Sequence, residues 1–316
     1  MNVIQRLTSV PLADRLNAVP PRFFWPTLLA FFRYAFRQAS LATRRETGSR
    51  EFVSHLHYKH AHYLEKAMLC EYPRSPELDA SHAALKAYVA SPEGQRDDSR
   101  WYLRKLIDEY EQYPSGFRCY MLDVPLKPRP PEDAQIVRRV IVQRRSIRSF
   151  DRRPLSADLL KKVVEAGSYA PTSCNAQPVS FLTLDDRATI DAVFGAADGA
   201  RDWKDQIPTG ILVLTDRRHY KPFQQHLVMF QDVAAATQNC LLMAEALGLA
   251  ACWVSLLTDA HMDDQSEIYA RLGLPEHMVI GAAIAIGHPV NAVCHVPRRH
   301  LSNVWHHGRF GRSRGE

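Results

Sequence analysis

The stretch RRSIRSFDRRPLSADLLKKVVEAGSYAPTSCNAQP, from Arg144 to Pro178, joins an arginine cluster to a loop bracketed by prolines. Between them, Ser156 is a good N-cap for a helix over Asp158–Ser168, because its side-chain oxygen can accept from the free amides of the first turn. Upstream, Glu132–Arg145 has the spacing of an amphipathic helix, with Pro131 suited to its first turn. The stretch therefore predicts two helices, with the arginine cluster at the end of the first and a rigid loop after the second.

Strand and helix patterns alternate beyond this loop. Four apolar runs have the length of buried strands, namely Val179–Leu184, Gly210–Leu214, Ala250–Ser255 and Met278–Ile286. A longer helix rich in Ala, Leu, Met and Val is expected from about Pro222 to Leu247, with Gly248 as its stop. This alternation predicts a layered α+β domain.

A composition change near residue 124 marks a domain boundary. The segment VPLKPRPPE at 124–132 contains four prolines, which favours an extended connector. Upstream, helical spacing is clear over His55–Leu69 and Trp101–Tyr110. We therefore expect a mainly helical N-terminal extension at 1–123, a proline-rich linker at 124–131 and a second domain at 132–316.

Composition limits the function and the location. The chain has 316 residues and a net charge of +6 without a run of five like charges, which disfavours nucleic-acid binding but allows a few arginines to hold a phosphate. Six cysteines without a CxxC pair suit a reducing cytoplasm. We expect no signal peptide from the first residues, and no uncharged apolar run reaches the length of a membrane span. The apolar stretch at 23–36, FFWPTLLAFFRYAF, has arginines around it. It suggests either a helix packed on the other domain or peripheral contact of residues 20–45 with the inner membrane surface.

The first chemical motif is RRSIR, with Arg144, Arg145, Ser146 and Arg148 at the end of the predicted helix. On a helix, Arg144 and Arg148 would share a face at i,i+4 spacing. Planar guanidinium groups form bidentate, charge-assisted bonds with phosphate oxygens, so the cluster could bind a terminal phosphate. The alternative is a solvated basic face.

The second motif is the loop APTSCNAQP, whose hydroxyl and amide groups could satisfy the polar edge of a planar heterocycle. An ordinary capped connection is the alternative. Farther along, Asp232 and Asn239 on the apolar helix are expected to make internal hydrogen bonds. Ser255 and Leu256 lie at the end of a strand, where backbone groups can approach a ligand.

Three motifs taken in order resemble those of the nitroreductase family, over about Pro131–Phe310. They are RRSIRSF, APTSCNAQP and the helix with Gln231, Asp232 and Asn239 that runs into GLAACWVS. The resemblance implies a three-layer α/β/α sandwich around a mostly antiparallel sheet. It also implies an intertwined homodimer with two FMN molecules at the interface.

The resemblance also assigns residues to the flavin. By position, the FMN phosphate and ribityl chain would contact Arg144, Arg145, Ser146 and Arg148, and a loop of the partner subunit would contribute Pro171, Thr172, Ser173 and Asn175. Lys204 would lie near the pyrimidine ring, Ser255 and Leu256 near N5, and Arg298 on the phosphate. The family often has a glutamate where Ser255 lies and a smaller residue where Leu256 lies, so the pocket near N5 is expected to differ.

The implied activity is that of an FMN-dependent oxidoreductase. NAD(P)H would reduce the flavin, and an organic acceptor would reoxidise it in a ping-pong hydride transfer at N5, with no catalytic side chain needed. One alternative is a flavin-dependent dehydrogenase of a biosynthetic intermediate. It is suggested by HAHYLEKAMLCEYPRS, which resembles an N-terminal extension of nitroreductase-like proteins encoded with polysaccharide-biosynthesis genes. The other is a non-catalytic interaction protein that keeps the fold.

Two further features bear on metal and thiol chemistry. His55, His57, His60 and His62 invite a metal site, but on a helix only His55 and His62 share a face, and no cysteine or carboxylate completes the set. We therefore expect no metal and place these histidines on a surface or interdomain face. Cys174, in the loop, has no neighbour that would stabilise a thiolate, so packing is its expected role.

Overall fold

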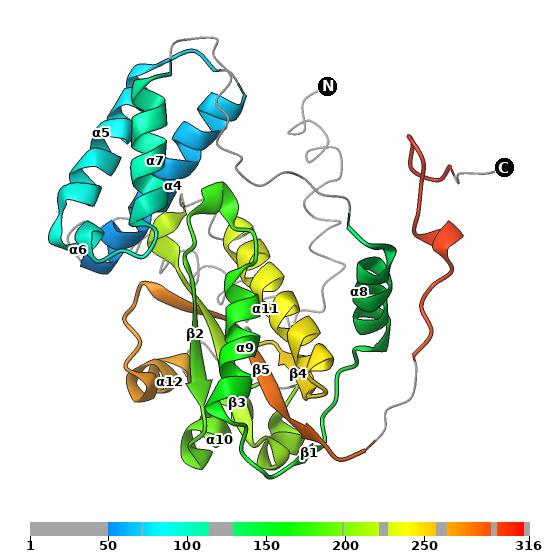
Figure 1. Ribbon diagram of the computed structural model, residues 1–316. Coiled ribbons are helices and arrows are strands. Elements are labelled where there is room, and N and C mark those ends of the chain that lie inside the picture. The colour runs from blue at the N-terminus through cyan, green and yellow to red at the C-terminus, as the bar shows by residue number, and fades with distance from the viewer. Residues whose placement is uncertain are drawn as a thin grey trace, which may run out of the picture.

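Strand β3 (Thr209–Asp216) is buried along its whole length, because helices cover both faces of the sheet at whose centre it lies. The computed structural model describes residues 50–70, 72–113, 129–197, 199–220, 227–256, 264–291 and 296–312. β3 pairs on one side with β2 (Val179–Leu184) and on the other with β5 (Met278–Pro289). β4 (Ala250–Val254) and the short β1 (Phe150–Asp151) both pair with the other edge of β5. These pairings are all antiparallel (Figure 1).

The side chains of β3 alternate between two core layers. Ile211 and Val213 pack with α9 (Ala157–Ser168) and α11 (Val228–Ala246), whereas Leu212 and Leu214 pack with α10 (Arg187–Gly195) and α12 (Asp264–Leu272). This period of two follows from the pleat of a strand. The predicted three-layer α+β sandwich with a mostly antiparallel sheet is confirmed.

Local signals set the helix ends of this domain. The hydroxyl of Ser156 accepts from the backbone N–H of Leu159 at 3.3 Å, as expected of the N-cap of α9. After α11, Gly248 adopts a φ of +70°, which a side chain would disfavour. α8 (Pro131–Gln143) begins at a proline as predicted. It ends two residues earlier than expected, however, and this changes the geometry of the arginine cluster.

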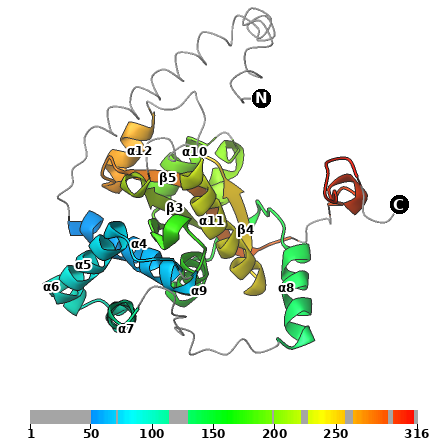
Figure 2. The same ribbon diagram turned by 90° about the horizontal axis from the view of Figure 1, so that it is seen from above.

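The described part of the N-terminal region is a separate helical unit with its own core. It contains α4 (Arg50–Leu69), α5 (Pro76–Ala90), the one-turn α6 (Pro92–Gln95) and α7 (Arg100–Glu111). Leu64, Leu85, Leu103 and Leu106 are fully buried within it. Figure 2 shows the unit beside α9, at one end of the sandwich. The predicted linker lies almost wholly outside the described residues, as does the 20–45 segment.

Two histidines of α4 make their contacts inside this unit. His57 is buried and stacks on Tyr88 with ring centroids 3.9 Å apart, and His60 Nδ1 lies 3.1 Å from the hydroxyl of Ser81. The prediction of a surface or interdomain face was thus wrong for His57, whose ring fills space between α4 and α5. Among the described residues, no three His, Cys, Asp or Glu side chains are placed to hold a metal ion. No described helix is long and apolar enough to cross a bilayer.

Candidate functional site

The arginine cluster is extended, not helical. The helical prediction for Arg144 and Arg145 was wrong: Arg144 has a φ of −51° and a ψ of 131°, so the helix ends at Gln143. Ser146 then forms a parallel bridge with Ala251 of β4, and the backbone N–H of Ile147 donates to the carbonyl of Ala251 at 3.1 Å. Pairing with a strand edge, which no local sequence signal reveals, has overridden the helical spacing.

Extended backbone still brings Arg144 and Arg148 to one side. Side chains two residues apart share a face of a strand, so Arg144, Ser146 and Arg148 lie together. The pKa of the Cys252 thiol on β4 depends on all three of these side chains. Burial raises its pKa, and the charges of Arg148 and Arg144 and a hydrogen bond with Ser146 oppose that rise. The two guanidinium groups thus act on one point at the edge of β4.

These arginines have the properties of an anion site. Among the described residues, no carboxylate forms an ion pair with Arg144, Arg145 or Arg148. Arg145 is the most engaged of the three, because its Nη1 donates to the carbonyls of Val142 at 2.6 Å and Arg144 at 2.7 Å, whereas Nη1 of Arg148 reaches the carbonyl of Ser146 only at 3.5 Å. Arg144, Arg148 and the exposed hydroxyl of Ser146 therefore remain available to an anionic group such as phosphate.

Two other predicted residues lie in or beside the core layer of α10 and α12. Leu256 is buried in the core layer of α10 and α12, where Ile147 and Trp203 also pack. The ring of Trp203 lies 6.2 Å from that of Phe150, and Lys204 is its neighbour in η2 (Arg201–Gln206). The ammonium group of Lys204 pairs with Asp205 at 3.2 Å. Ser255, next to Leu256, is exposed.

The 171–177 loop is held in a strained conformation. Three of its residues other than glycine have positive φ, namely Cys174 at 52°, Asn175 at 48° and Gln177 at 48°. Each such residue costs roughly 1 kcal/mol or more, and it persists only where the surroundings impose it. Within the loop, the hydroxyl of Thr172 accepts from the backbone N–H of Gln177 at 3.0 Å. Strain concentrated in so short a segment is typical of a functional site.

A buried carboxylate on α11 anchors the start of this loop. Both oxygens of Asp232 accept from the backbone N–H of Ser173, at 3.1 and 3.0 Å, and the hydroxyl of Tyr220 donates to the same carboxylate at 2.7 Å. Burial raises the pKa of Asp232, against the opposing effect of these donors. The expected internal bonds of Asp232 and Asn239 are confirmed, since Asn239 donates to the carbonyl of Ala166 at 3.2 Å. Asp232 thus positions the loop.

Two tyrosines of α4 also meet this loop, and no local pattern in the sequence indicates it. α4 packs against η1 (Ser173–Asn175). Burial raises the pKa of Tyr63, and the neighbouring thiol of Cys174 raises it further. Tyr58 lines a cavity together with Thr172 and Gln177. Cys174 therefore packs as expected, but against a helix more than a hundred residues earlier in the chain.

Arg298 is not brought to the cluster within this chain. It is exposed and lies in the 296–312 segment, which extends away from the sandwich beside α8 (Figure 1). The loop at 171–177 is also remote from the arginines. The structure thus groups the predicted residues into one set at the edge of β4, a second at the start of α11 and the separate Arg298.

Comparison with known proteins decides the family. The model of the nitroreductase family matches residues 141–198 and 192–288. A protein of Archaeoglobus fulgidus, named for NADH dehydrogenase/NAD(P)H nitroreductase activity, is 30% identical over 155 residues, which are 48% of this chain and 84% of that protein. The chain belongs to the nitroreductase family.

Other relatives of this nitroreductase-family chain are more distant or match in part. An FMN reductase [NAD(P)H] of Bacillus subtilis is 27% identical over 173 residues, covering 50% of this chain and 68% of that enzyme. A solved nitroreductase from Desulfovibrio desulfuricans, in complex with FMN, is 30% identical with a TM-score of 0.47, covering 58% of this chain and 99% of that one. The family model begins at residue 141, so the helical unit lies outside it.

Proposed function

We propose that this member of the nitroreductase family is an FMN-dependent oxidoreductase, reduced by NAD(P)H and reoxidised by an organic acceptor. The observation that carries the proposal is the pair Arg144 and Arg148 beside Ser146, without ionic partners among the described residues, at the edge of β4. This donor set fits the phosphate of FMN. The names of the relatives, which include an NAD(P)H nitroreductase and an FMN reductase, support the same chemistry.

The protein's part in such a reaction is binding and orientation. When bound, the flavin supplies hydride transfer at N5, alternately from the nicotinamide and to the acceptor. Arg144, Arg148 and Ser146 would hold its phosphate end, and Arg145 would contribute from the other side of the segment. Lys204 would place positive charge near the pyrimidine ring, and Ser255 and Leu256 would lie near N5. Pro171, Thr172, Ser173 and Asn175 would contact the ring system.

We further propose that the site is completed by a second copy of the chain. The loop is bound to Asp232 near the start of α11, and the arginine segment is bound to Ala251, just after its end. From Asp232 to Ala246 the helix rises roughly 20 Å. A homodimer that brings the loop and Arg298 of one copy to the arginines of the other would gather both sets around one flavin.

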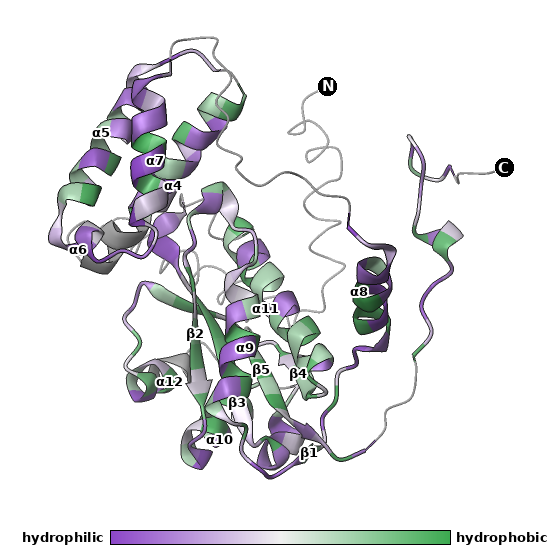
Figure 3. Ribbon diagram, viewed as in Figure 1, coloured by the Kyte–Doolittle hydropathy of each residue, from purple (hydrophilic) through white to green (hydrophobic). Residues whose placement is uncertain are grey.

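Exposed apolar side chains support a dimer. No residue of α8 is buried, and four large apolar side chains on it are exposed, namely Ile136, Val137, Ile141 and Val142, of which Val137 is 56% exposed. In Figure 3 the lower turns of the α8 ribbon carry the colour of hydrophobic residues. In the 296–312 segment, Leu301, Trp305 and Phe310 are exposed as well. A large exposed apolar surface of this kind is typical of a protein interface.

The cofactor proposal is tested on purified protein. We expect a yellow preparation that releases FMN on denaturation and bleaches when NADH or NADPH is added without oxygen. A preparation that binds no FMN, even on reconstitution, would overturn the enzyme proposal and leave the interaction protein. If a biosynthetic intermediate reduces the flavin and neither NADH nor NADPH does, the result would favour the dehydrogenase.

The dimer proposal is tested by complementation. An Arg144→Ala/Arg148→Ala chain and a Ser173→Pro/Asn175→Ala chain should each bind FMN weakly. When the two are mixed under conditions that exchange subunits, each mixed dimer has one site with both sets intact. We expect about half of the wild-type FMN per mixed dimer to be recovered, whereas no recovery would place both sets around the flavin of a single chain.

The proposed place of action is the cytoplasm. Cys70, Cys174, Cys240 and Cys252 are free thiols, as a reducing compartment would keep them. Contact of residues 20–45 with the inner membrane surface stays a prediction, because that segment lies outside the described residues.

A further inference from the structure

A cavity of about 210 Å³ lies where the helical unit meets the nitroreductase domain. Tyr58 of α4 forms its wall on the side of the helical unit. Gly167, Ala170 and Ala236 contribute small apolar surfaces from α9, its end and α11. Thr172 and Gln177 line it from the strained loop. The cavity thus joins two parts of the chain, only one of which matches the family model.

The lining selects for size and charge. A cavity of about 150 Å³ holds a benzene molecule, so this one can hold a single substituted ring. None of its described lining residues carries a charge, which disfavours an ionised ligand. Its polar groups are the hydroxyls of Tyr58, Ser168 and Thr172 and the amide of Gln177. The hydroxyl of Ser168 already donates to the carbonyl of Glu165 at 2.7 Å, so only its oxygen remains to accept. Together the four groups supply both donors and acceptors, as an oxygen substituent on a ring requires.

The loop side of the cavity retains hydrogen-bonding capacity. The oxygen of Thr172 accepts from the backbone N–H of Gln177, which leaves its O–H to donate elsewhere. The side-chain amide of Gln177 reaches Asn175 only at 3.5 Å, the limit for a hydrogen bond. The positive φ of Gln177, at 48°, indicates a conformation held at a cost. A ligand in the cavity would use these groups.

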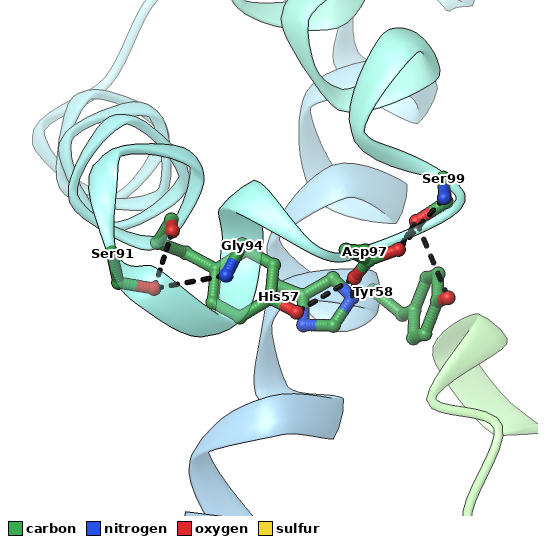
Figure 4. Close-up of polar contacts among 7 residues, drawn as sticks. His57, Tyr58, Ser91, Gly94, Asp97 and Ser99 are labelled. Atoms are coloured by element: carbon green, nitrogen blue, oxygen red, sulfur yellow. Dashed lines mark hydrogen bonds and ion pairs between the residues drawn. The ribbon is translucent and has the colours of Figure 1, made fainter.

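The position of Tyr58 is fixed by a polar network inside the helical unit (Figure 4). Its hydroxyl lies 3.3 Å from that of Ser99, which donates to Asp97 at 2.5 Å. Tyr88 also donates to Asp97, at 2.6 Å, and Nε2 of His57 lies 3.2 Å from the same carboxylate. Burial alone would raise the pKa of Asp97, but the donors Ser99 and Tyr88 and the charge of His57 lower it.

We propose that this junction cavity binds a small uncharged molecule with one six-membered ring and a hydrogen-bonding oxygen, oriented by the hydroxyl of Tyr58. Tyr58 is then a specificity residue contributed by the helical unit. The consequence for the flavin rests on the proposed function, because it depends on the contact of Thr172 and its loop with FMN. A ligand in the cavity contacts the loop and so changes the surroundings of the flavin.

Phenol is the probe, titrated into the full-length protein and followed by calorimetry. We expect one phenol per chain. Tyr58→Phe removes one hydrogen bond and should weaken binding about 5- to 10-fold. Ala170→Leu fills the cavity and should abolish binding, and Ser168→Leu is the second filling variant if Ala170→Leu does not fold. Tyr102→Phe removes a hydroxyl of α7 that does not line the cavity and should leave binding unchanged. Circular dichroism checks that each variant is folded.

The outcomes separate this inference from the proposed function. Failure to bind phenol, or binding that either Tyr58→Phe or the filling variant leaves unchanged, overturns the cavity as a site. A protein that binds phenol but cannot bind FMN overturns only the proposed function. In the FMN-loaded protein, phenol should shift the absorbance of the flavin. A flavin spectrum that saturating phenol does not shift overturns the link between the cavity and the loop.

Discussion

The arginine segment and the 171–177 loop are both short and polar, yet the protein holds them in different ways. The segment is extended and is bound to β4 through the bridge of Ser146 with Ala251, with no positive φ among its residues. The loop contains three residues of positive φ and is bound through side chains, above all the buried Asp232. The segment thus depends on the sheet, and the loop depends on single side chains. Substitutions should therefore disturb them differently.

The largest effect is expected from the arginine segment. Arg144→Ala/Arg148→Ala removes two charge-assisted contacts, each of about 1.5–3 kcal/mol, so the Kd of FMN should rise at least about 100-fold. The free energy of unfolding without FMN should change little, because neither side chain is buried and the bridge to Ala251 uses backbone atoms. Fluorescence titration with FMN and urea unfolding measure the two quantities.

The control for this pair is Arg152→Ala/Arg153→Ala, which removes the same charge a few residues later, where Arg153 pairs with Asp151 at 2.6 Å. It should leave the Kd of FMN within about threefold. An equal loss of affinity in both double variants would mean that only the net charge matters.

The next effect is expected at the support of the loop. Asp232→Asn replaces one of two acceptor oxygens by a donor that faces the donors Ser173 and Tyr220. This mismatch should weaken FMN binding about tenfold and leave Arg144 and Arg148 undisturbed. The neighbouring, exposed Gln231 is the control: Gln231→Ala should leave the Kd unchanged.

The same variant should alter the pH dependence of stability. Burial raises the pKa of Asp232 in the folded state, so its carboxyl binds a proton more tightly there than in the unfolded chain. Its contribution to the free energy of unfolding is therefore full at a pH below the ordinary pKa of an aspartate. The contribution is lost as the pH rises through the pKa of the folded state. The free energy of unfolding of the wild type should exceed that of Asp232→Asn by more at about pH 5 than at about pH 7, as measured by urea unfolding. A difference that grows toward neutral pH would contradict this assignment.

A smaller effect, on the free energy of unfolding, is expected from glycine substitutions that compare the 171–177 loop with the arginine segment. Gln177→Gly relieves a φ of 48° and keeps the backbone donor to Thr172, so the free energy of unfolding should rise by up to about 1 kcal/mol. Ser149→Gly, in the extended segment, relieves no such strain and should lower that free energy by about 0.5–1 kcal/mol. Urea unfolding of the two variants, without FMN, decides whether the loop alone is strained.

The smallest effect is expected at Arg145. Its guanidinium already bonds to the carbonyls of Val142 and Arg144, so it has less to offer to a phosphate than its neighbours. Arg145→Ala should raise the Kd of FMN only about two- to threefold, in the range of exposed ionic contacts. A rise as large as that of Arg148→Ala would show that Arg145 turns toward the phosphate.

The elements that follow local rules could be predicted from the sequence. β2 lies at the predicted residues, the N-cap of Ser156 and the stop at Gly248 are where their chemistry places them, and β3 extends only a few residues beyond the predicted run. Apolar period and capping are properties of neighbouring residues, so a single sequence contains them.

The features that depend on tertiary contacts could not be predicted. The arginine segment carries a helical spacing that pairing with β4 overrides. Tyr63 has the spacing of an apolar helix face, but it is 37% exposed and touches the loop. Tyr58 carries no local sign of its role, because the cavity exists only once α4 lies on the nitroreductase domain.

The packing of α4 on η1 has a thermodynamic consequence. If FMN binds more tightly when the helical unit is docked, then docking must be more favourable by the same factor when FMN is bound. Docking of the helical unit and binding of FMN then stabilise each other, because both contact the 171–177 loop. Anything that pulls α4 away would release flavin, and loading with flavin would protect the extension against proteolysis and heat.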